Sequence, residues 1–183
     1  MAEHPGSTAI REWRQADASA LVRLADDKQV WLGLRDAFPH PYGLGDALSF
    51  IALAGRMHPP TFFAIEVDGA LAGGTGYTRR TDVERIGAEV GYWLGRTFWN
   101  RGIATAALRL LTAQAFAADR ELRRLWAVPF VTNVASARVL EKAGYVREGL
   151  LRQSAIKEGR VLDQWMYAIL RADADPQSLD PSR

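Results

Sequence analysis

The sequence contains no cysteine among its 183 residues. Disulfide bonds, thiolate metal sites, iron–sulfur clusters and a cysteine nucleophile are therefore excluded, and a reactive sulfur has to arrive with a cofactor. Histidine is scarce as well, because only His4, His40 and His58 are present and they show none of the spacings typical of metal sites. We therefore expect no metal cofactor.

A large surplus of either charge is also missing. Lys and Arg number 23 against 21 for Asp and Glu, so the formal net charge is +2, well below the basic surplus typical of proteins that bind a phosphate backbone. No run approaches the roughly 20 apolar residues that cross a bilayer, and residues 1–7 lack the basic and apolar segments of a signal peptide. We therefore expect a cytoplasmic protein without membrane contact or direct nucleic-acid binding.

The sequence does contain enough apolar side chains for one domain. Hydrophobic residues make up 48% of the chain, and 183 residues is the length of a single domain with its own core. We assign residues 8–171 to this domain. Residues 172–183 are mostly polar and contain two prolines, which predicts a flexible C-terminal tail.

The spacing of apolar residues predicts an α/β domain with a mixed sheet and no internal repeat. Alternating segments predict strands at 8–13, 61–67, 70–79, 86–94, 122–128, 145–150 and 161–170. Helical spacing predicts one helix with Asp17 as its N-cap and others at 46–57, 103–118 and 134–143, the last ended by Gly144. Asp68-Gly69 predicts a hairpin between the second and third strands. Residues 31–45 are expected to form an aromatic loop.

Two glycine-containing segments raise the question of a nucleotide site. Gly73-Gly74-Thr75-Gly76 lies within a predicted strand and lacks a following Gly-Lys-Ser/Thr, so a bulge or a close backbone approach is expected there. Residues 100–105 instead open the predicted helix 103–118. Free N–H groups at a helix start can bind a diphosphate, but a tight turn that needs Gly102 for its backbone angle explains the same residues.

Two sequence blocks resemble a known family. Glu-Val-Gly-Tyr-Trp-Leu at residues 89–94, followed by Trp-Asn-Arg-Gly-Ile-Ala-Thr at 99–105, is similar to the acetyl-CoA-binding core of the GNAT acetyltransferases. A second block is similar to the signature helix of the RimJ/RimL-like branch, which acetylates the N-termini of ribosomal proteins, and it comprises Asn133, Ser136, Arg138, Leu140, Gly144 and Tyr145. The resemblance implies the GNAT fold for residues 8–171.

The resemblance also implies a reaction and a coenzyme site. Acetyl would pass directly from the thioester of coenzyme A to a primary amine without a covalent enzyme intermediate, in agreement with the absence of cysteine. In the GNAT fold the strands at 89–94 and 122–128 diverge, and the pantetheine lies between them. Coenzyme-binding residues are then expected at Tyr92, Trp93, Leu94, Asn100, Arg101, Gly102, Ile103, Ala104, Thr105, Asn133, Ser136 and Arg138.

One position departs from the superfamily pattern. Trp99 stands where the superfamily pattern has Gln or Arg, and tryptophan is common at this position in the RimJ/RimL-like branch. The resemblance therefore implies that the phosphates depend on backbone N–H groups and on Arg101. Backbone N–H groups near Trp93 and Leu94 would face the thioester carbonyl.

Glu89 and Ser136 are the expected catalytic residues. Glu89 would accept or steer the amine proton through water, although a structural ion pair or hydrogen bond explains a carboxylate there equally well. Ser136 would hydrogen-bond the departing thiolate and Asn133 the pantetheine amide, although both residue types also cap helices. Leu140 occupies the position of the tyrosine that several GNAT enzymes use as general acid, and Tyr145 is expected in the core. The proton donor is then Ser136, solvent or nothing.

Other residues have two interpretations each. Arg138 and Lys142 lie four apart on a predicted helix and could reach coenzyme phosphates or adenine, while a solvated helix face explains Lys142 better. Trp31, Phe38 and Tyr42 could form the wall of an amine pocket, although ordinary packing explains them as well.

The acceptor is expected to be a protein N-terminus or a small-molecule amine, and the sequence does not choose between them. A homodimer is compatible with the resemblance. The alternative on the same fold is a catalytically weak acyl-CoA-binding sensor or interaction module; the missing tyrosine leaves it open, while Glu89 and Ser136 argue against it. A nucleotide-binding protein of another α/β fold is disfavoured, because no glycine motif fits a dinucleotide or a triphosphate.

Overall fold

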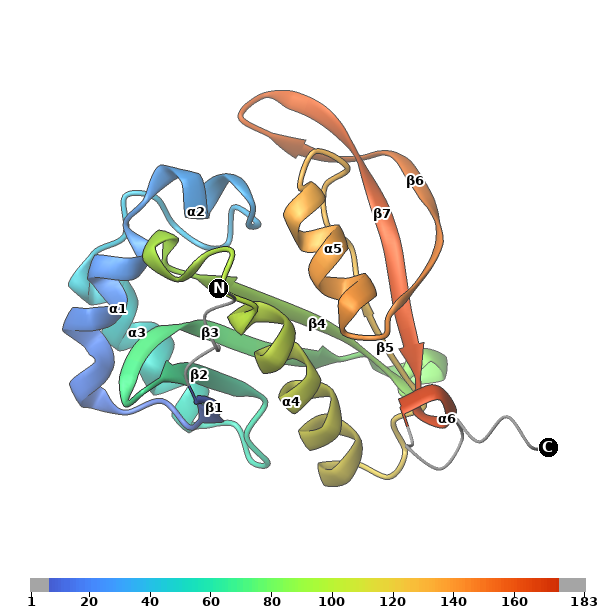
Figure 1. The fold of residues 1–183 in the computed structure, drawn as a ribbon, viewed down its shortest axis with the longest axis horizontal. Helices are drawn as coiled ribbons and strands as arrows, with labels where there is room; N and C mark the ends of the chain where they lie inside the picture. The colour runs from blue at the N-terminus through green and yellow to red at the C-terminus, as the bar shows by residue number, and fades with distance from the viewer. Residues whose placement is uncertain (1–6, 175–183) are drawn as a thin grey trace, which may run out of the picture.

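The computed structural model describes residues 7–174. Its strands are β1 (Thr8–Arg11), β2 (Phe62–Val67), β3 (Ala70–Arg79), β4 (Gly87–Leu94), β5 (Arg124–Ala127), β6 (Val146–Lys157) and β7 (Arg160–Leu170). Its α-helices are α1 (Ala18–Ala25), α2 (Lys28–Leu32), α3 (Leu44–Gly55), α4 (Ile103–Ala118), α5 (Val134–Lys142) and α6 (Arg171–Ala174). Short 3-10 helices cover Gln15–Asp17, Asp82–Glu84 and Arg96–Phe98. The predicted order of elements and the α/β class are confirmed (Figure 1).

The predictions differ from the structure in the aromatic loop and in the C-terminal tail. Helix α2 occupies the start of the segment predicted as an aromatic loop. Of the predicted C-terminal tail, residues up to 174 lie in α6, and residues 175–183 are outside the described part of the chain, as is His4. Within residues 7–174, no helix combines the length and apolarity that a membrane crossing requires.

The strands form one mixed sheet of seven strands in the order β1-β2-β3-β4-β5-β7-β6. Neighbours are antiparallel except β4 and β5, which run parallel. The predicted hairpin joins β2 to β3, and both of its turn residues, Asp68 and Gly69, have positive φ, as a two-residue type I′ turn requires.

The glycine-rich stretch of β3 is a close-packed strand, as the sequence predicts. The pairing with β2 shifts between Ile65 and Glu66, which is a bulge. A Cβ on Gly73 would collide with the carbonyl of Trp93, and one on Gly74 would lie 2.8 Å from the Trp93 indole nitrogen. Glycine is therefore needed here for the approach of β4, not for a phosphate.

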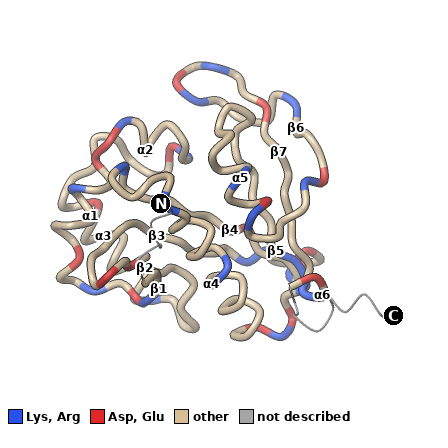
Figure 2. The backbone as a smooth tube through the Cα atoms, in the orientation of Figure 1, with Lys and Arg blue, Asp and Glu red and all other residues tan. Residues whose placement is uncertain are grey.

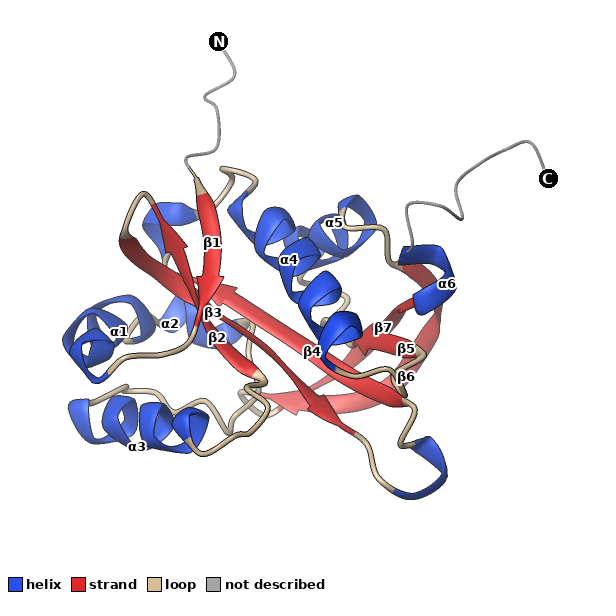
Figure 3. Cartoon of the chain, turned by 90° about the horizontal axis from the view of Figure 1, so that it is seen from below, coloured by secondary structure: helices blue, strands red, loops and turns tan. Residues whose placement is uncertain are grey.

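Helices cover both faces of the β1–β4 half of the sheet (Figure 3). On one face α4 inserts Leu108 and Leu111 into a cluster with Val90 of β4 and Leu125 of β5. On the other face α1 and α3 pack together around Leu21 and are joined by aromatic residues of the connecting loops and by Trp93 of β4. Because side chains alternate along a strand, consecutive residues of β4 face opposite layers.

The carboxylate of Asp17 does not cap α1, although Asp17 is the residue that precedes the helix. It accepts hydrogen bonds from the Arg11 guanidinium at 2.8 and 2.9 Å and from the Arg14 backbone N–H at 2.9 Å. Burial by itself would raise the pKa of Asp17, but these donors outweigh it and hold the pKa below its usual value. The side chain therefore ties β1 to the start of α1. At the other predicted cap, Gly144 has φ +95° and follows Ala143, the C-cap of α5, as predicted.

Candidate active site

The site lies where β4 and β5 separate. The two strands pair only from Gly87 opposite Arg124 to Glu89 opposite Trp126. Strand β5 ends at Ala127, whereas β4 continues to Leu94. The second half of β4 is therefore not covered by β5, and the divergence that the resemblance implies is present (Figure 1).

One cavity, here called the α4–α5 cavity, has a volume of about 600 Å³ and lies between the end of β4 and the starts of α4 and α5. Helix α2 forms part of its wall. Every residue that the sequence predicts to bind coenzyme lines it: Tyr92, Trp93, Leu94, Asn100, Arg101, Gly102, Ile103, Ala104, Thr105, Asn133, Ser136 and Arg138. Segments far apart in the sequence thus form one concave surface.

The start of α4 supplies backbone donors to this cavity. Gly102 is the N-cap and has φ +76°, a left-handed conformation that favours glycine. The first N–H groups of a helix have no partner within the helix and carry the positive end of its dipole. A Cβ added to Gly102 would meet no atom within 4 Å. Gly102 therefore fits both interpretations of this segment. It makes a turn that needs glycine, and it borders open space where a diphosphate could bind.

Trp99 stabilises the loop before α4. Its indole Nε1 donates to the carbonyl of Leu94, the last residue of β4, at 2.8 Å. The Arg101 guanidinium lies 5.7 Å from the centre of the Phe98 ring. Trp99, which stands where the superfamily pattern has Gln or Arg, thus anchors the loop. The positive groups around the cavity are backbone N–H groups and the basic side chains Arg101, Arg138 and Lys142.

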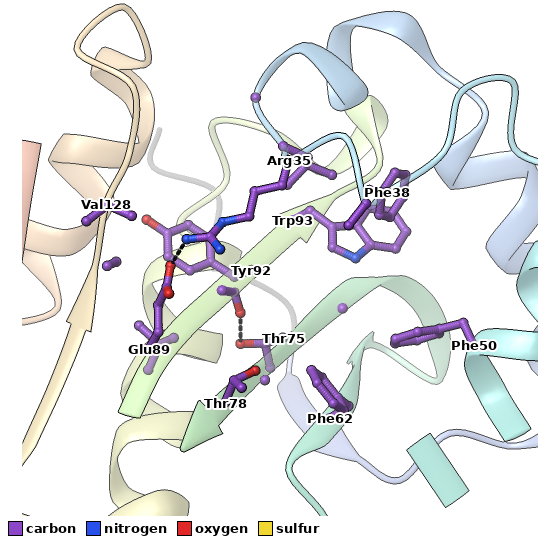
Figure 4. A pocket seen from close by; sticks show the side chains of 18 of the residues that line it. Arg35, Phe38, Phe50, Phe62, Thr75, Thr78, Glu89, Tyr92, Trp93 and Val128 are labelled. Carbon is purple, nitrogen blue, oxygen red and sulfur yellow. Dashed lines mark hydrogen bonds and ion pairs between the residues drawn. The ribbon is translucent and has the colours of Figure 1, made fainter. Parts of the chain in front are cut away.

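A second cavity, here called the α3 cavity, has a volume of about 900 Å³. It lies between α3, the loop that follows α2, strands β3 and β4, and the segment after β5 (Figure 4). The two cavities share lining residues Gly33, Leu34, Tyr92, Trp93, Phe130 and Ser136. They therefore meet at the gap between β4 and α5.

Two hydroxyl groups lie at this meeting point. The Tyr92 hydroxyl and Ser136 Oγ are 2.8 Å apart, and the Tyr92 hydroxyl also donates to the Ser136 carbonyl at 3.1 Å. Burial raises the pKa of the Tyr92 phenol above its usual value, so the hydroxyl keeps its proton. Asn133 Oδ1 accepts a hydrogen bond from the backbone N–H of Ser136 at 3.0 Å, so Asn133 caps helix α5.

Glu89 lines the α3 cavity and makes an ion pair with Arg35. The Glu89 side chain is 20% exposed and that of Arg35 is 66% exposed, so the pair lies at the open side of the cavity. Sequence reasoning missed Arg35, because the two partners are 54 positions apart and no motif surrounds Arg35. It also missed Phe50 and Phe62, whose apolar spacing predicts only core residues.

Most of the other residues singled out in the sequence lie in the core or beside the α3 cavity. Leu140 is fully buried, and Tyr145 is a core residue whose hydroxyl lies 2.9 Å from Thr112 Oγ1, as expected. Phe38 and Tyr42 line the α3 cavity. Trp31 instead stacks on a histidine and on the ammonium of a lysine, so its role is packing.

The charges of the described residues do not form a surface of one sign. Figure 2 shows basic and acidic segments interspersed over both halves of the chain. Across residues 7–174, no cluster of three or more histidine, aspartate or glutamate side chains is arranged to hold a metal ion. The positive field of the site is therefore local to the start of α4 and the neighbouring basic side chains.

Comparisons with known proteins agree with this geometry. Residues 8–146 match the model of the acetyltransferase (GNAT) domain. The N-acetyltransferase p20 of Bacillus licheniformis is 30% identical over 123 residues, which is 67% of each chain. The ribosomal-protein-serine acetyltransferase of Escherichia coli K12 is 35% identical over 81 residues, 44% of this chain and 45% of that one. The matched segments thus span about half to two thirds of the length of these relatives.

Among solved structures, RimJ of Mycobacterium smegmatis in complex with CoA-disulfide is similar over nearly the whole chain. The TM-score is 0.81 at 26% identity, and the match covers 92% of this chain and 84% of RimJ. The similarity supports the predicted RimJ/RimL-like branch. With the domain match over residues 8–146 and the cavity that the signature residues form together, the chain belongs to the GNAT family of N-acetyltransferases.

Proposed function

We propose that the protein transfers acetyl from acetyl-CoA directly to the primary amine of an acceptor. The observation that carries this proposal is the meeting of the α4–α5 cavity and the α3 cavity at Tyr92 and Ser136. Two substrates that enter from separate cavities can bring their reacting groups together at such a junction, which is what direct transfer requires.

The α4–α5 cavity is the proposed coenzyme site. The N–H groups of Ile103, Ala104 and Thr105 would bind the diphosphate, with Arg101 and Arg138 contributing positive charge. Backbone N–H groups near Trp93 and Leu94, on the part of β4 that β5 leaves uncovered, would polarise the thioester carbonyl. The complex of RimJ with a coenzyme A disulfide, at 26% identity, supports this assignment. Asn133 would contribute its Nδ2 to the pantetheine amide, since its Oδ1 already caps α5.

The chemistry assigns a role to each polar group at the junction. The amine nitrogen attacks the thioester carbon, the carbon–sulfur bond breaks, and the thiolate needs a proton. Glu89, once released from Arg35, would take the ammonium proton through water. The Ser136 hydroxyl would protonate the departing thiolate while the adjacent Tyr92 hydroxyl, 2.8 Å away, passes it a proton. Tyr92 would take up the second proton that the attacking nitrogen releases, so neither hydroxyl is left charged. This pair would perform the task of the tyrosine that Leu140 replaces.

Two classes of acceptor are compatible with this chemistry. A relative named as a ribosomal-protein-serine acetyltransferase supports a protein acceptor. A small-molecule amine uses the same chemistry, because both present an uncharged primary amine to the thioester.

A thiol-release assay with acetyl-CoA against small amines and N-terminal peptides tests the function. Glu89→Gln should lower kcat by about a hundredfold, the usual contribution of a general base, with unchanged acetyl-CoA affinity by calorimetry. Glu66→Gln is the matched control, because Glu66 is a partly buried carboxylate of the same sheet that pairs with Arg11. Tight coenzyme binding without turnover of any amine would replace the enzyme by the acyl-CoA sensor.

A further inference from the structure

The floor of the α3 cavity is a part of the sheet with almost no side chains. Strands β3 and β4 pair with Gly76 opposite Gly91 and with Thr78 opposite Glu89. Alternate residues of a strand share a face, so Glu89 and Gly91 project toward the same layer as Gly76. A Cβ on Gly91 would meet no atom within 4 Å. Gly91 therefore leaves a bare stretch of backbone that borders open space, whereas the Phe62 ring covers the buried Gly76 beside it.

Aromatic rings form the wall beside this floor. Phe62 pairs with Gly76, and a Cβ on Gly76 would lie 2.5 Å from the Phe62 ring. Trp93 pairs with Gly74 in the same manner. Phe38 contacts the Trp93 ring edge to face at 5.4 Å, and Phe50 contacts the Phe62 ring at 6.0 Å. All four aromatic side chains line the cavity and are only partly buried. The glycines of β3 thus allow two of these rings to lie against the strand.

The ion pair of Glu89 and Arg35 lies at the other end of the cavity. Figure 4 shows Glu89 and Arg35 on the side of Tyr92 and Val128, across from Phe50 and Phe62. Asp46, which also lines the cavity, accepts the Gly43 backbone N–H at 2.8 Å as part of the start of α3. One end of the cavity can therefore hold an amine beside Glu89, and the other offers apolar surface that releases water on contact.

We propose that the α3 cavity binds the acceptor, and that this acceptor is a primary amine carrying an aromatic group. This inference rests on the proposed transfer to an amine. The amino group lies between Glu89 and the Tyr92–Ser136 pair, and the ring lies over Gly91, against the Phe62 ring that covers Gly76. A flat ring fits a slot between a backbone floor and an edge-on aromatic wall better than a branched aliphatic group does. Two sources share this chemistry: a free arylalkylamine and a peptide with an aromatic N-terminal residue.

The test compares acceptors that differ only in the ring. Thiol release is measured with 2-phenylethylamine and n-propylamine, and with tripeptides that begin with phenylalanine or alanine. The wild-type protein should show about tenfold or higher kcat/KM for the aromatic member of at least one pair. A higher rate for the amine identifies a small molecule as the source, and a higher rate for the tripeptide identifies a peptide.

Gly91→Leu places a side chain into the slot without a collision inside the protein. It should lower kcat/KM for the aromatic acceptor at least tenfold and leave the small acceptor within about threefold, with unchanged acetyl-CoA affinity by calorimetry. Gly149→Leu is the matched control, since Gly149 is an exposed glycine of β6 whose Cβ would also meet nothing within 4 Å. Gly149→Leu should leave kcat/KM unchanged for both acceptors.

Equal kcat/KM for aromatic and small acceptors would overturn this inference while leaving the proposed function intact. An equal loss with both acceptor types in Gly91→Leu would overturn it as well. Absence of turnover with every amine would overturn the proposed function, and this inference with it.

Discussion

Replacing Gly102 with alanine tests the start of α4 as the anion site. The residue has φ +76°, where a Cβ costs about 1–2 kcal/mol. The added methyl group meets no protein atom within 4 Å, so this strain is the whole expected cost to the unliganded protein. Gly159→Ala is a matched control, because Gly159 has φ +72° and equally open surroundings in the turn between β6 and β7. The two variants should therefore lose similar stability in urea denaturation.

Coenzyme binding should separate the two variants. In Gly102→Ala the methyl group would keep the diphosphate away from the N–H groups of Ile103 and Ala104. A hydrogen bond to a charged group is worth about 1.5–3 kcal/mol, so the loss of one weakens affinity roughly ten- to hundredfold. Calorimetric titration with coenzyme A measures this directly. Equal dissociation constants for Gly102→Ala and Gly159→Ala would refute the anion site.

Three further predictions follow from polar contacts. Tyr92→Phe and Ser136→Ala should each lower kcat about tenfold or more in steady-state assays. Because the two hydroxyls act as a pair, the loss in the double variant should be smaller than the product of the two single losses. A loss equal to that product would contradict the proton relay. Asp17 has a lowered pKa, so its stabilisation is present above its usual pKa of 3.8 and is lost as the pH falls below it. Urea denaturation across that range should show a smaller pH dependence for Asp17→Asn, and an unchanged dependence would exclude this assignment. Asp36→Ala leaves the buried Lys157 ammonium without its carboxylate at 2.7 Å, and urea denaturation should show a loss of about 1 kcal/mol, limited by the exposure of Asp36; an unchanged midpoint would speak against the pair.

The Lys157 pair also has a structural consequence for the site. Lys157 lies at the end of β6, and its ammonium is 3.4 Å from the centre of the Trp31 ring in α2. Lys28 of α2 pairs with Glu158 in the same turn at 2.7 Å. These contacts join the β6–β7 hairpin to α2, the helix that borders the α4–α5 cavity.

The sequence by itself determined the elements whose signals are local. Helix α4 begins and ends where its apolar spacing predicts, and the turn at Asp68 and Gly69 forms the predicted hairpin. The coenzyme-binding residues expected from the sequence lie in two short blocks, each a strand end or loop running into a helix start, and all of them line the α4–α5 cavity. Backbone donors at a helix start depend only on neighbouring residues.

The acceptor side of the site depends on tertiary structure. Helix α2 has five residues, too few for a periodic pattern. Arg35 and Glu89 are 54 positions apart, and Tyr92 and Ser136 are 44 apart. The glycines of β3 indicate a close approach, but the rings that approach them come from β2 and β4. Local interactions are encoded by residues within a few positions of one another, whereas the α3 cavity and its ion pair exist only because packing of the sheet and helices brings distant side chains together.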